Sequence, residues 1–541
     1  MFRHTLRSIS SAILVWGMLA CSGPPATQEA HLGEISIEVT GLASAKPSFQ
    51  EGLLLLHSFE YEDARTAFLQ AQGKDAHFAM AYWGEALSYH HTLWDRQDYD
   101  AGVAALSKIK ALEREGLTES LSPLEKELIA GANILYGEGS RLDRNRAYAD
   151  FMAKLFKANP KNHEVASFYA LALLGSVPEG RGRDYAVYEK GAKIAQGILN
   201  ENPKHPGALH YLIHSYDDPD HAPMALEAAN SYSKVAPDAA HALHMPSHIY
   251  VALGMWDEVV SSNIASYEAS EKRMERMELG NQGRSYHALD WLMYGQLQKG
   301  NWAACEKIMQ DMQSYARATP TYRARDYWVH MIGTYAVALD NWEENWMHDT
   351  LRTEDLSLPT RGIVAYIKGR KAALQKDAGG LAEAIQSLAL ARQAAILQKT
   401  EGGGTNCSSY AGRPANQLQI DMAEIVEMEL LALQATQEGK LEEADQILKD
   451  AMALDRTLNY SFGPPEVVKP IYEAYGDWLM AQDRVEEAEK AYRECLNRTP
   501  QRRLTLLGLA KALEKQEQSG PADSLRQVVA SFEAATIALQ P

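Results

Sequence analysis

Histidines gathered in three short segments are the clearest chemical signal in this chain. These segments lie between residues 209 and 290, and together they contain six histidines and one aspartate that are candidate site residues: His210, His214, His241, His244, His248, His287 and Asp290. Imidazole titrates near neutral pH and is the commonest protein ligand of metals. These side chains therefore predict a site that binds a metal or another ligand, or that catalyses a reaction. Each histidine taken alone is better explained by a structural hydrogen bond, and only their number favours a site.

The spacing inside each segment places the histidines on one face of a helix. Side chains three, four or seven positions apart are neighbours on a helix, a relation that holds within the first segment and within the second. In a stacked repeat of two antiparallel helices, positions 2, 5 and 9 of the first helix usually point into the concave groove, and these histidines fall on those positions. First helices of neighbouring repeats pack about 8–10 Å apart. We therefore expect the imidazoles to converge on one ion or one anionic group.

A metal bound by these histidines would be a divalent transition metal, with zinc, copper or iron as candidates, because these ions bind imidazole nitrogen well. The pair His210 and His214 has no glutamate beside its first histidine, so the pattern of zinc proteases is missing. Four further residues are weaker candidates for ligand contacts, and they are His90, His91, Asp217 and His330. Asp217 follows the first segment, and the pair His90 and His91 is expected at the end of a first helix that reaches the same groove.

Pro246 interrupts the second segment and leaves two interpretations open. If a helix runs through it, the proline removes one backbone hydrogen bond and kinks the helix, which separates His241 and His244 from His248. If a helix begins at Pro246, which suits the first helical position, His241 and His244 lie on the preceding loop. The repeat spacing from Pro237 favours the kinked helix.

The elements that must position these residues are helical repeats. Residues 469–502 contain two helical patterns joined by a tight turn, with small Ala488 at the helix crossing and Pro500 ending the unit. This unit resembles the tetratricopeptide repeat of about 34 residues. Comparable units cover residues 45–78, 206–239, 240–273, 286–319, 326–359 and 425–458. The sequence therefore predicts an all-α fold, a solenoid of roughly eight to eleven stacked antiparallel helix pairs.

Several segments together resemble one family of bacterial secreted tetratricopeptide-repeat proteins. The resemblance rests on the three histidine segments, above all His244-Met-Pro-Ser-His248, and on Leu53-Leu-Leu-Leu-His57-Ser-Phe59 and Phe462-Gly-Pro-Pro465. It covers nearly the whole mature chain and implies a tetratricopeptide-like solenoid. It implies no particular activity, substrate or cofactor.

The N-terminus has the pattern of an export signal. In residues 1–20 a positively charged start precedes a short apolar run, and residues 18–21 resemble the bacterial lipobox. The resemblance implies that Cys21 is lipidated, that residues 21–44 form a polar tether, and that acyl chains hold the protein in the cell envelope. Ser22 implies the outer membrane, with the protein facing the periplasm. An ordinary secretory signal cleaved nearby remains the alternative.

The mature chain is expected to divide into three regions after the tether. Residues 45–400 form an N-terminal solenoid with the histidine-lined groove, and residues 418–541 form the C-terminal repeats. Between them, residues 401–417 are rich in Gly, Ser and Asn, which is typical of a linker or lid.

Charge and cysteine content limit the classes of binding partner and of disulfide that we expect for this chain. The net charge of -18, from 53 basic and 71 acidic residues, opposes binding to a phosphate backbone, so no nucleic-acid partner is expected. Cys305, Cys407 and Cys495 are too widely spaced for a disulfide framework, although one disulfide among them stays open. Beyond the N-terminus, no apolar run is long enough to predict a membrane span.

Two functional interpretations follow from these features. In the first, an envelope-anchored solenoid binds a protein or peptide partner, or a small ligand, in its histidine-lined concave groove, as repeat solenoids usually do. In the second, the same histidines hold a metal, and the protein is a metal-dependent enzyme or a metal carrier. The fold does not decide between them, because function depends on the site.

Overall fold

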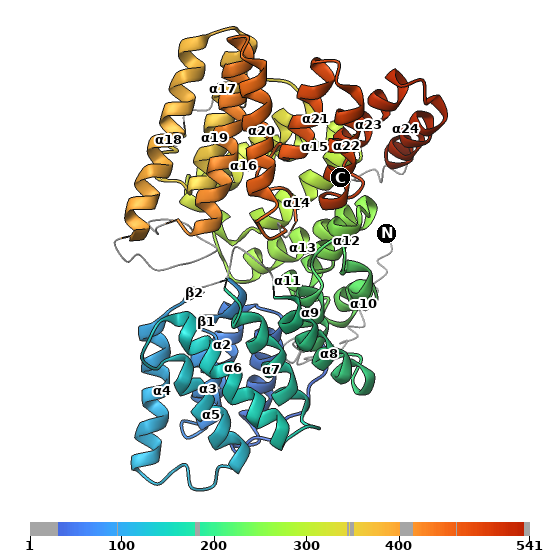
Figure 1. Cartoon of the computed structure of the whole chain (residues 1–541). Helices are drawn as coiled ribbons and strands as arrows, with labels where there is room; N and C mark the ends of the chain where they lie inside the picture. The colour runs from blue at the N-terminus through green and yellow to red at the C-terminus, as the bar shows by residue number, and fades with distance from the viewer. Residues whose placement is uncertain are drawn as a thin grey trace, which may run out of the picture.

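The chain folds into stacked pairs of α-helices in a computed structural model that describes residues 31–94, 96–178, 184–342, 346, 351–400, 415–460 and 463–534. Across these residues the strands form one short hairpin, in which β1 (His90–His91) pairs with β2 (Arg96–Gln97). Consecutive helices pack as antiparallel pairs in chain order (Figure 1). The expected all-α solenoid of helix pairs is confirmed.

The first half of the chain forms the lower part of Figure 1. Its helices are α1 (Lys46–His57), α2 (Tyr61–Lys74), α3 (Ala79–Leu87), α4 (Tyr99–Arg114), α5 (Pro123–Leu135), α6 (Arg141–Ala158), α7 (His163–Gly175), α8 (Tyr185–Glu201), α9 (Pro206–Ser215) and α10 (Leu226–Val235). The middle helices are α11 (Ala240–His244), α12 (Pro246–Leu253), α13 (Trp256–Arg276), α14 (Tyr286–Gln298), α15 (Trp302–Ala318) and α16 (Tyr322–Leu339).

The remaining helices complete the solenoid, and three short 3₁₀ turns join elements along it. The C-terminal helices are α17 (Leu358–Leu374), α18 (Ala378–Thr400), α19 (Gln417–Gln437), α20 (Leu441–Asp455), α21 (Ile471–Ala481), α22 (Val485–Arg498), α23 (Arg503–Lys515) and α24 (Ser519–Ala534). The 3₁₀ turns are η1 (Thr92–Trp94), η2 (Ala222–Ala225) and η3 (Asn281–Gly283).

The repeat signals in the sequence correspond to real turns and crossings. Gly254 ends α12 with a φ of +69°, a left-handed conformation that favours glycine at a helix end. Ala488 is fully buried in the α21–α22 pair, where a small side chain lets two helices approach closely. Local residue choice therefore sets where each helix pair turns and how closely it packs.

One expected helix pair is incomplete, so the prediction of a full repeat over residues 326–359 is wrong. Its first helix is α16, but the described residues between Trp342 and Ser357 contain no α-helix, and α17 begins only at Leu358. The Trp342 ring packs edge-on against Tyr366, with centroids 5.9 Å apart. Trp342 therefore packs against α17, the helix that follows.

The helix that carries the second histidine segment is broken but not lost at Pro246. Helix α11 ends at His244 and α12 begins at Pro246, while Met245 between them keeps helical angles (φ -52°, ψ -36°). The Met245 N–H still donates to the carbonyl of His241 (2.9 Å). The chain therefore continues through the proline, as the kinked-helix interpretation requires.

The C-terminal repeats return to the middle of the chain, and Figure 1 shows α21 to α24 in red above α12 to α14 in green. The Trp256 indole donates to the carbonyl of Gln501 (3.1 Å). The Arg502 guanidinium donates to the hydroxyl of Tyr294 (3.2 Å). Gly463 lies so close to α14 that a Cβ there would overlap the Trp291 ring. The segment before α21 thus covers one side of α14.

The chain before α1 packs onto the helices. Residues 31–44 belong to the stretch expected as a tether, yet Leu32 and Val39 are buried. The Glu34 N–H donates to the carbonyl of Lys204 (2.9 Å). The expected signal segment 1–20 and Cys21 lie outside the described residues.

The linker, the cysteines and the apolar helices can also be compared with the expectations from the sequence. Residues 401–414 of the expected linker lie outside the described residues, and α18 and α19 on either side pack against each other. Cys305 and Cys495 are buried free thiols, while Cys407 lies outside the described residues. No helix in the described part of the chain is both long enough and apolar enough to cross a membrane.

Candidate metal centre

The six histidines of the three segments come together in the structure as a six-histidine cluster. In each of two groups, one ring nitrogen per residue lies within 4.8 Å of the others: the first triad is His210, His214 and His241, and the second triad is His244, His248 and His287. The first triad comes from α9 and α11, and the second from α11, α12 and α14. The kink at Pro246 and the turn between helix pairs thus bring three separate segments to one place.

The two triads are adjacent. The ring centroids of His214 and His248 lie 5.8 Å apart, and those of His241 and His244 lie 6.1 Å apart. Within the first triad, His214 Nε2 donates a hydrogen bond to His210 Nε2 (3.1 Å), because the proton of His210 is on Nδ1. The cluster is therefore continuous, although shorter distances hold within the triads than between them.

Two of the rings donate through Nδ1 to acceptors that cannot move away. His210 Nδ1 donates to the backbone carbonyl of His57 (2.8 Å). His248 Nδ1 donates to the buried carboxylate of Asp217 (2.6 Å), a weaker candidate from the sequence. Because Nδ1 carries the proton, the neutral ring keeps its lone pair on Nε2. Histidines that bind metals are usually oriented by a carbonyl or carboxylate on their other nitrogen.

His244 is oriented in the same way, by an amide. Its Nδ1 donates to Oδ1 of Asn263 (2.7 Å), and the amide nitrogen of Asn263 donates to the carbonyl of Val259 (2.8 Å), which fixes the amide. Among the described residues, no atom forms a hydrogen bond with His244 Nε2 or with His241 Nε2, although both are buried. An unpaired buried acceptor costs free energy, and an ion bound there would remove that cost.

Burial keeps the imidazoles neutral. The pKa values of four rings lie well below the usual 6.5, because burial disfavours the charged ring and neighbouring histidines repel a proton: these rings are His210, His241, His244 and His287. Neutral imidazole is the form that binds metals.

Exposure divides the cluster into a buried floor and a rim. The floor consists of the rings with fixed acceptors, whose exposed fractions are 0%, 2% and 8% for His210, His244 and His248. The rim consists of half-buried rings: His214, His241 and His287. An ion entering from solvent would therefore meet side chains that can rotate before it meets those that cannot.

Each triad has its own aromatic wall. The Phe59 ring lies 4.2–6.0 Å from the three rings of the first triad, measured between centroids. The Trp291 ring lies 4.6–5.4 Å from the three rings of the second triad. Phe59 has a φ of +56°, a left-handed conformation that is uncommon for an aromatic residue, and such strained positions often mark functional sites.

Asp290, a candidate ligand from the sequence, belongs to neither triad. Its carboxylate accepts from Nδ1 of His330 (2.9 Å), which is the weaker sequence candidate. Burial alone would lower the pKa of His330, but Asp290 raises it to about 9. The two residues form an ion pair beside the second triad, next to Tyr327, whose hydroxyl bonds His287 Nδ1 (3.1 Å).

His90 and His91 do not end a helix, and that prediction is wrong. Helix α3 ends at Leu87, where the Tyr136 hydroxyl and the Ser88 hydroxyl satisfy carbonyls of its last turn. The two histidines instead form strand β1. The His91 ring stacks on the Tyr61 ring, with centroids 3.8 Å apart. Burial, together with the charge of Arg141, lowers the pKa of His90 to about 3. Neither histidine belongs to one of the triads.

A second group of histidines, which we call the Glu164 cluster, lies beneath the first triad. Its members His57, Glu164 and His205 are fully buried. Glu164 accepts from His57 Nε2 (2.8 Å) and from His205 Nε2 (3.2 Å). The carbonyl of the same His57 accepts from His210, so the two clusters are joined through one residue.

Several residues that shape the site give no signal in the sequence. Asn263 and Glu164 lie on other helices than their histidine partners, at unremarkable helical positions. His57 and Phe59 occur in a segment that carries the family resemblance, and that resemblance is the one sign that could have drawn attention to them.

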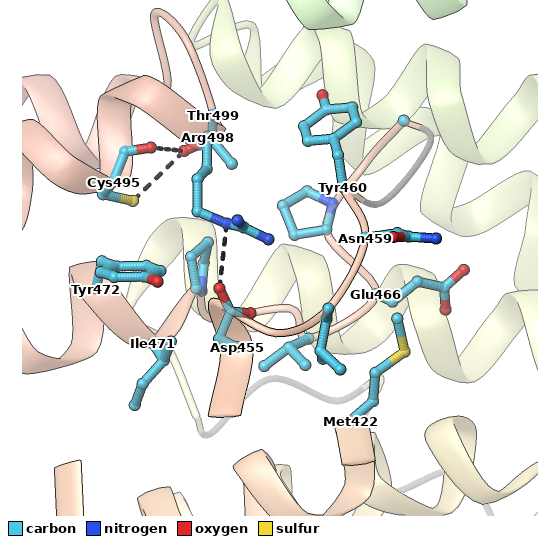
Figure 2. A pocket seen from close by; sticks show the side chains of 15 residues that line it. Met422, Asp455, Asn459, Tyr460, Glu466, Ile471, Tyr472, Cys495, Arg498 and Thr499 are labelled. Carbon is cyan, nitrogen blue, oxygen red and sulfur yellow. Dashed lines mark hydrogen bonds and ion pairs between the residues drawn. The ribbon is translucent and has the colours of Figure 1, made fainter. Parts of the chain in front are cut away.

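Residues of the segment before α21 line part of a cavity of about 60 Å³. Figure 2 shows Asp455 paired with Arg498 (3.1 Å) and Tyr460 on the segment that borders the cavity. Burial raises the pKa of Tyr460, and the charge of Asp217 raises it further. None of the six histidines lines this cavity in the described part of the chain.

Comparison with known proteins gives only distant likenesses. A scan against protein-family models and a search of curated proteins find no match. Among solved structures, the human IFIT1 dimer with m7Gppp-AAAA shares 13% identity at a TM-score of 0.35, covering 85% of this chain and 90% of that one. Yeast Tom70 shares 13% identity at a TM-score of 0.33, covering 91% and 99%. At these scores the likenesses carry no conclusion about the function of this chain.

Proposed function

We propose that this chain is a helical-repeat protein of the bacterial cell envelope whose six-histidine cluster binds transition-metal ions. The observation that carries the proposal is the state of the buried rings. His210, His244 and His248 each donate through Nδ1 to a fixed acceptor, so the neutral ring has its lone pair on Nε2. The lone pair of His210 accepts from His214 Nε2 (3.1 Å), and a bound ion would replace that hydrogen bond. Rings fixed in this way are prepared to bind an ion without a large loss of side-chain freedom.

The burial of these rings favours an ion over a peptide as the ligand. A side chain that is 0% exposed, such as His210, offers no surface to a peptide or protein partner. An ion needs only the lone pairs, and the half-buried rim gives it access from solvent. The metal-binding interpretation therefore explains more of the structure than partner binding in an open groove.

The donor set favours zinc, copper or iron. Both triads consist of imidazole nitrogens, which suit these ions. Magnesium and calcium prefer oxygen ligands, and the nearby carboxylates of Asp217 and Asp290 are already bonded to His248 and His330.

The anchoring part of the proposal rests on the lipobox-like sequence at Cys21. Acyl chains on this cysteine would hold the solenoid at the outer membrane, facing the periplasm. A Cys21→Ser variant should appear as soluble periplasmic protein or as unprocessed precursor in fractionated cells. Membrane fractionation like that of the unaltered protein would show that Cys21 is not lipidated.

Metal analysis of the full chain, purified without a histidine tag, tests the binding proposal. We expect bound zinc, copper or iron, and calorimetric titration of the metal-free protein should show saturable binding that weakens only as the pH falls toward the lowered pKa values of the buried rings, where protons compete for neutral imidazole. His214→Ala and His248→Ala should each lower the amount of metal bound, because each removes a donor from the cluster. His77→Ala, at an exposed histidine outside the cluster, is the matched control and should change nothing. Absence of binding above background with every metal would overturn the proposal.

A further inference from the structure

We infer that the six-histidine cluster is two tri-imidazole sites side by side, which together hold a pair of copper(I) ions. This inference rests on the proposed metal-binding function and deepens it. It assigns one ion to the first triad and one ion to the second triad.

Distances between the rings support two sites. Two imidazoles on one ion, at metal–nitrogen bonds of about 2.0–2.1 Å, have centroids about 5 Å apart. Within the triads, His210 lies 4.8 Å from His214 and 5.1 Å from His241, measured between centroids. His244 lies 5.1 Å from His248 and 4.5 Å from His287. Two pairs that link the triads are longer than these four, at 5.8 and 6.1 Å, and in each triad one ring nitrogen per residue lies within 4.8 Å of the other two.

The surroundings of the triads also differ from each other. Phe59 covers the rings of the first triad, and Trp291 covers those of the second. Each triad contains at least one buried ring that is fixed through Nδ1, together with at least one half-buried ring at the rim. Each triad therefore has the parts of a complete site, a fixed donor and donors that can close on an ion.

Charge favours a monovalent ion in both sites. All six donors are imidazoles. The carboxylate of Asp217, which lies next to them, already accepts a hydrogen bond from His248. At a given separation, two divalent ions repel each other about four times as strongly as two monovalent ions, and burial weakens the screening of that repulsion. Copper(I) also accepts three ligands as a complete set, whereas zinc usually takes four. Two copper(I) ions therefore fit this pair of imidazole triads better than two zinc ions.

Stoichiometry measured without oxygen tests the inference. The full chain is titrated with copper(I) against a coloured copper(I) chelator, and bound copper is counted per chain by elemental analysis. We expect two copper(I) ions in the unaltered protein. We expect one ion in His214→Ala, one ion in His287→Ala, and none in the double variant, because each single change removes a rim ligand of one triad. The control His77→Ala should keep two.

The outcomes separate this inference from the proposed function. One copper(I) ion per chain, or loss of both ions in each single variant with the helical content unchanged, would overturn the paired sites and leave metal binding intact. Binding of zinc without binding of copper(I) would also overturn the paired copper(I) sites and leave the proposed metal binding intact. No binding of either metal would overturn both proposals. If His287→Ala fails to fold, as judged by circular dichroism, His287→Asn replaces it, since an amide can keep a hydrogen bond with Tyr327.

Discussion

Two histidine clusters lie next to each other in this molecule, and their rings point their protons in opposite directions. In the Glu164 cluster, His205 Nδ1 accepts from the Ala208 N–H (3.2 Å), so its proton is on Nε2 and faces Glu164. His57 Nε2 also donates to Glu164, while the other ring nitrogen bonds the Tyr211 hydroxyl (2.9 Å). Every ring nitrogen in that cluster has a partner within the protein.

In the six-histidine cluster the protons of the buried rings face outward instead. Nδ1 of His210 and of His244 donates to an acceptor outside the cluster, and the buried Nε2 of His244 has no partner among the described residues. The Glu164 cluster is thus a structural network in which each ring nitrogen has a hydrogen-bond partner, whereas the six-histidine cluster has a ring nitrogen that can accept a bond from a ligand. The comparison teaches that the partner of each ring nitrogen, not the number of histidines, separates a structural cluster from a candidate site.

The largest expected effect comes from removing the carboxylate of the Glu164 cluster. Glu164→Ala leaves the N–H groups of His57 and His205 buried without an acceptor, so we expect the free energy of unfolding to fall by about 3–5 kcal/mol. Urea denaturation followed by circular dichroism measures it. Glu201→Ala, which removes the exposed partner of His163 (3.0 Å), is the control and should cost at most about 0.5 kcal/mol. Equal losses in the two variants would show that the cluster is not a structural network.

A smaller effect is expected from filling the contact between Gly463 and Trp291. Gly463→Ala adds a Cβ that overlaps the ring, at a φ of +108° that disfavours alanine. We expect a loss of about 1–3 kcal/mol and weaker metal binding, because Trp291 is pushed toward the second triad. Gly520→Ala is the control, since a Cβ there meets no atom within 4 Å. Unchanged metal affinity and stability in Gly463→Ala would mean that this segment does not support the cluster.

The two clusters should also differ in their response to acid. Burial alone would raise the pKa of Glu164, but its two imidazole partners outweigh burial and hold the pKa well below the usual 4.5. A carboxyl with a lowered folded-state pKa contributes stability that is fully present above its unfolded-state pKa and is lost as the pH falls toward its folded-state pKa. Between about pH 5 and about pH 3, we expect the free energy of unfolding to fall by up to about 1.4 kcal/mol per pH unit from this group. Glu164→Gln should flatten that slope in parallel urea titrations, and two identical slopes would rule out this role.

The smallest expected change in stability, but a clear change in binding, comes from the amide that orients His244. Asn263→Ala removes the acceptor of His244 Nδ1, and losing such a partner typically weakens metal affinity by about 10–100-fold. Calorimetric titration of the variant measures the change. Asn133→Ala is the control, because Asn133 makes a similar bond to a carbonyl of its own helix (2.9 Å) far from the cluster. Full affinity in Asn263→Ala would argue that the orientation of His244 does not matter for binding.

Much of the helical architecture could be read from the sequence because it depends on local pattern. The turn at Gly254 and the crossing at Ala488 follow from residue size and backbone freedom, and the structure has both where the repeat spacing puts them. Local pattern fails where distant packing intervenes. Trp342 has the position of a residue that opens a helix, but its contact with Tyr366 holds a loop, and the strand at His90 depends on pairing with Arg96–Gln97.

The sequence by itself determined which histidines share a helix face, because the spacing of three and four residues fixes that at the level of one helix. Only the tertiary structure decided which nitrogen of each ring is protonated. The acceptors of His210, His248 and His244 lie 153, 31 and 19 residues away in sequence. Hydrogen-bond partners that meet through the stacking of repeats leave no trace in local spacing. The sequence therefore determined which imidazoles lie on one helix face. The packing of α1, α9, α12 and α13 determined their hydrogen-bond partners, and with these the nitrogen that faces a bound ion.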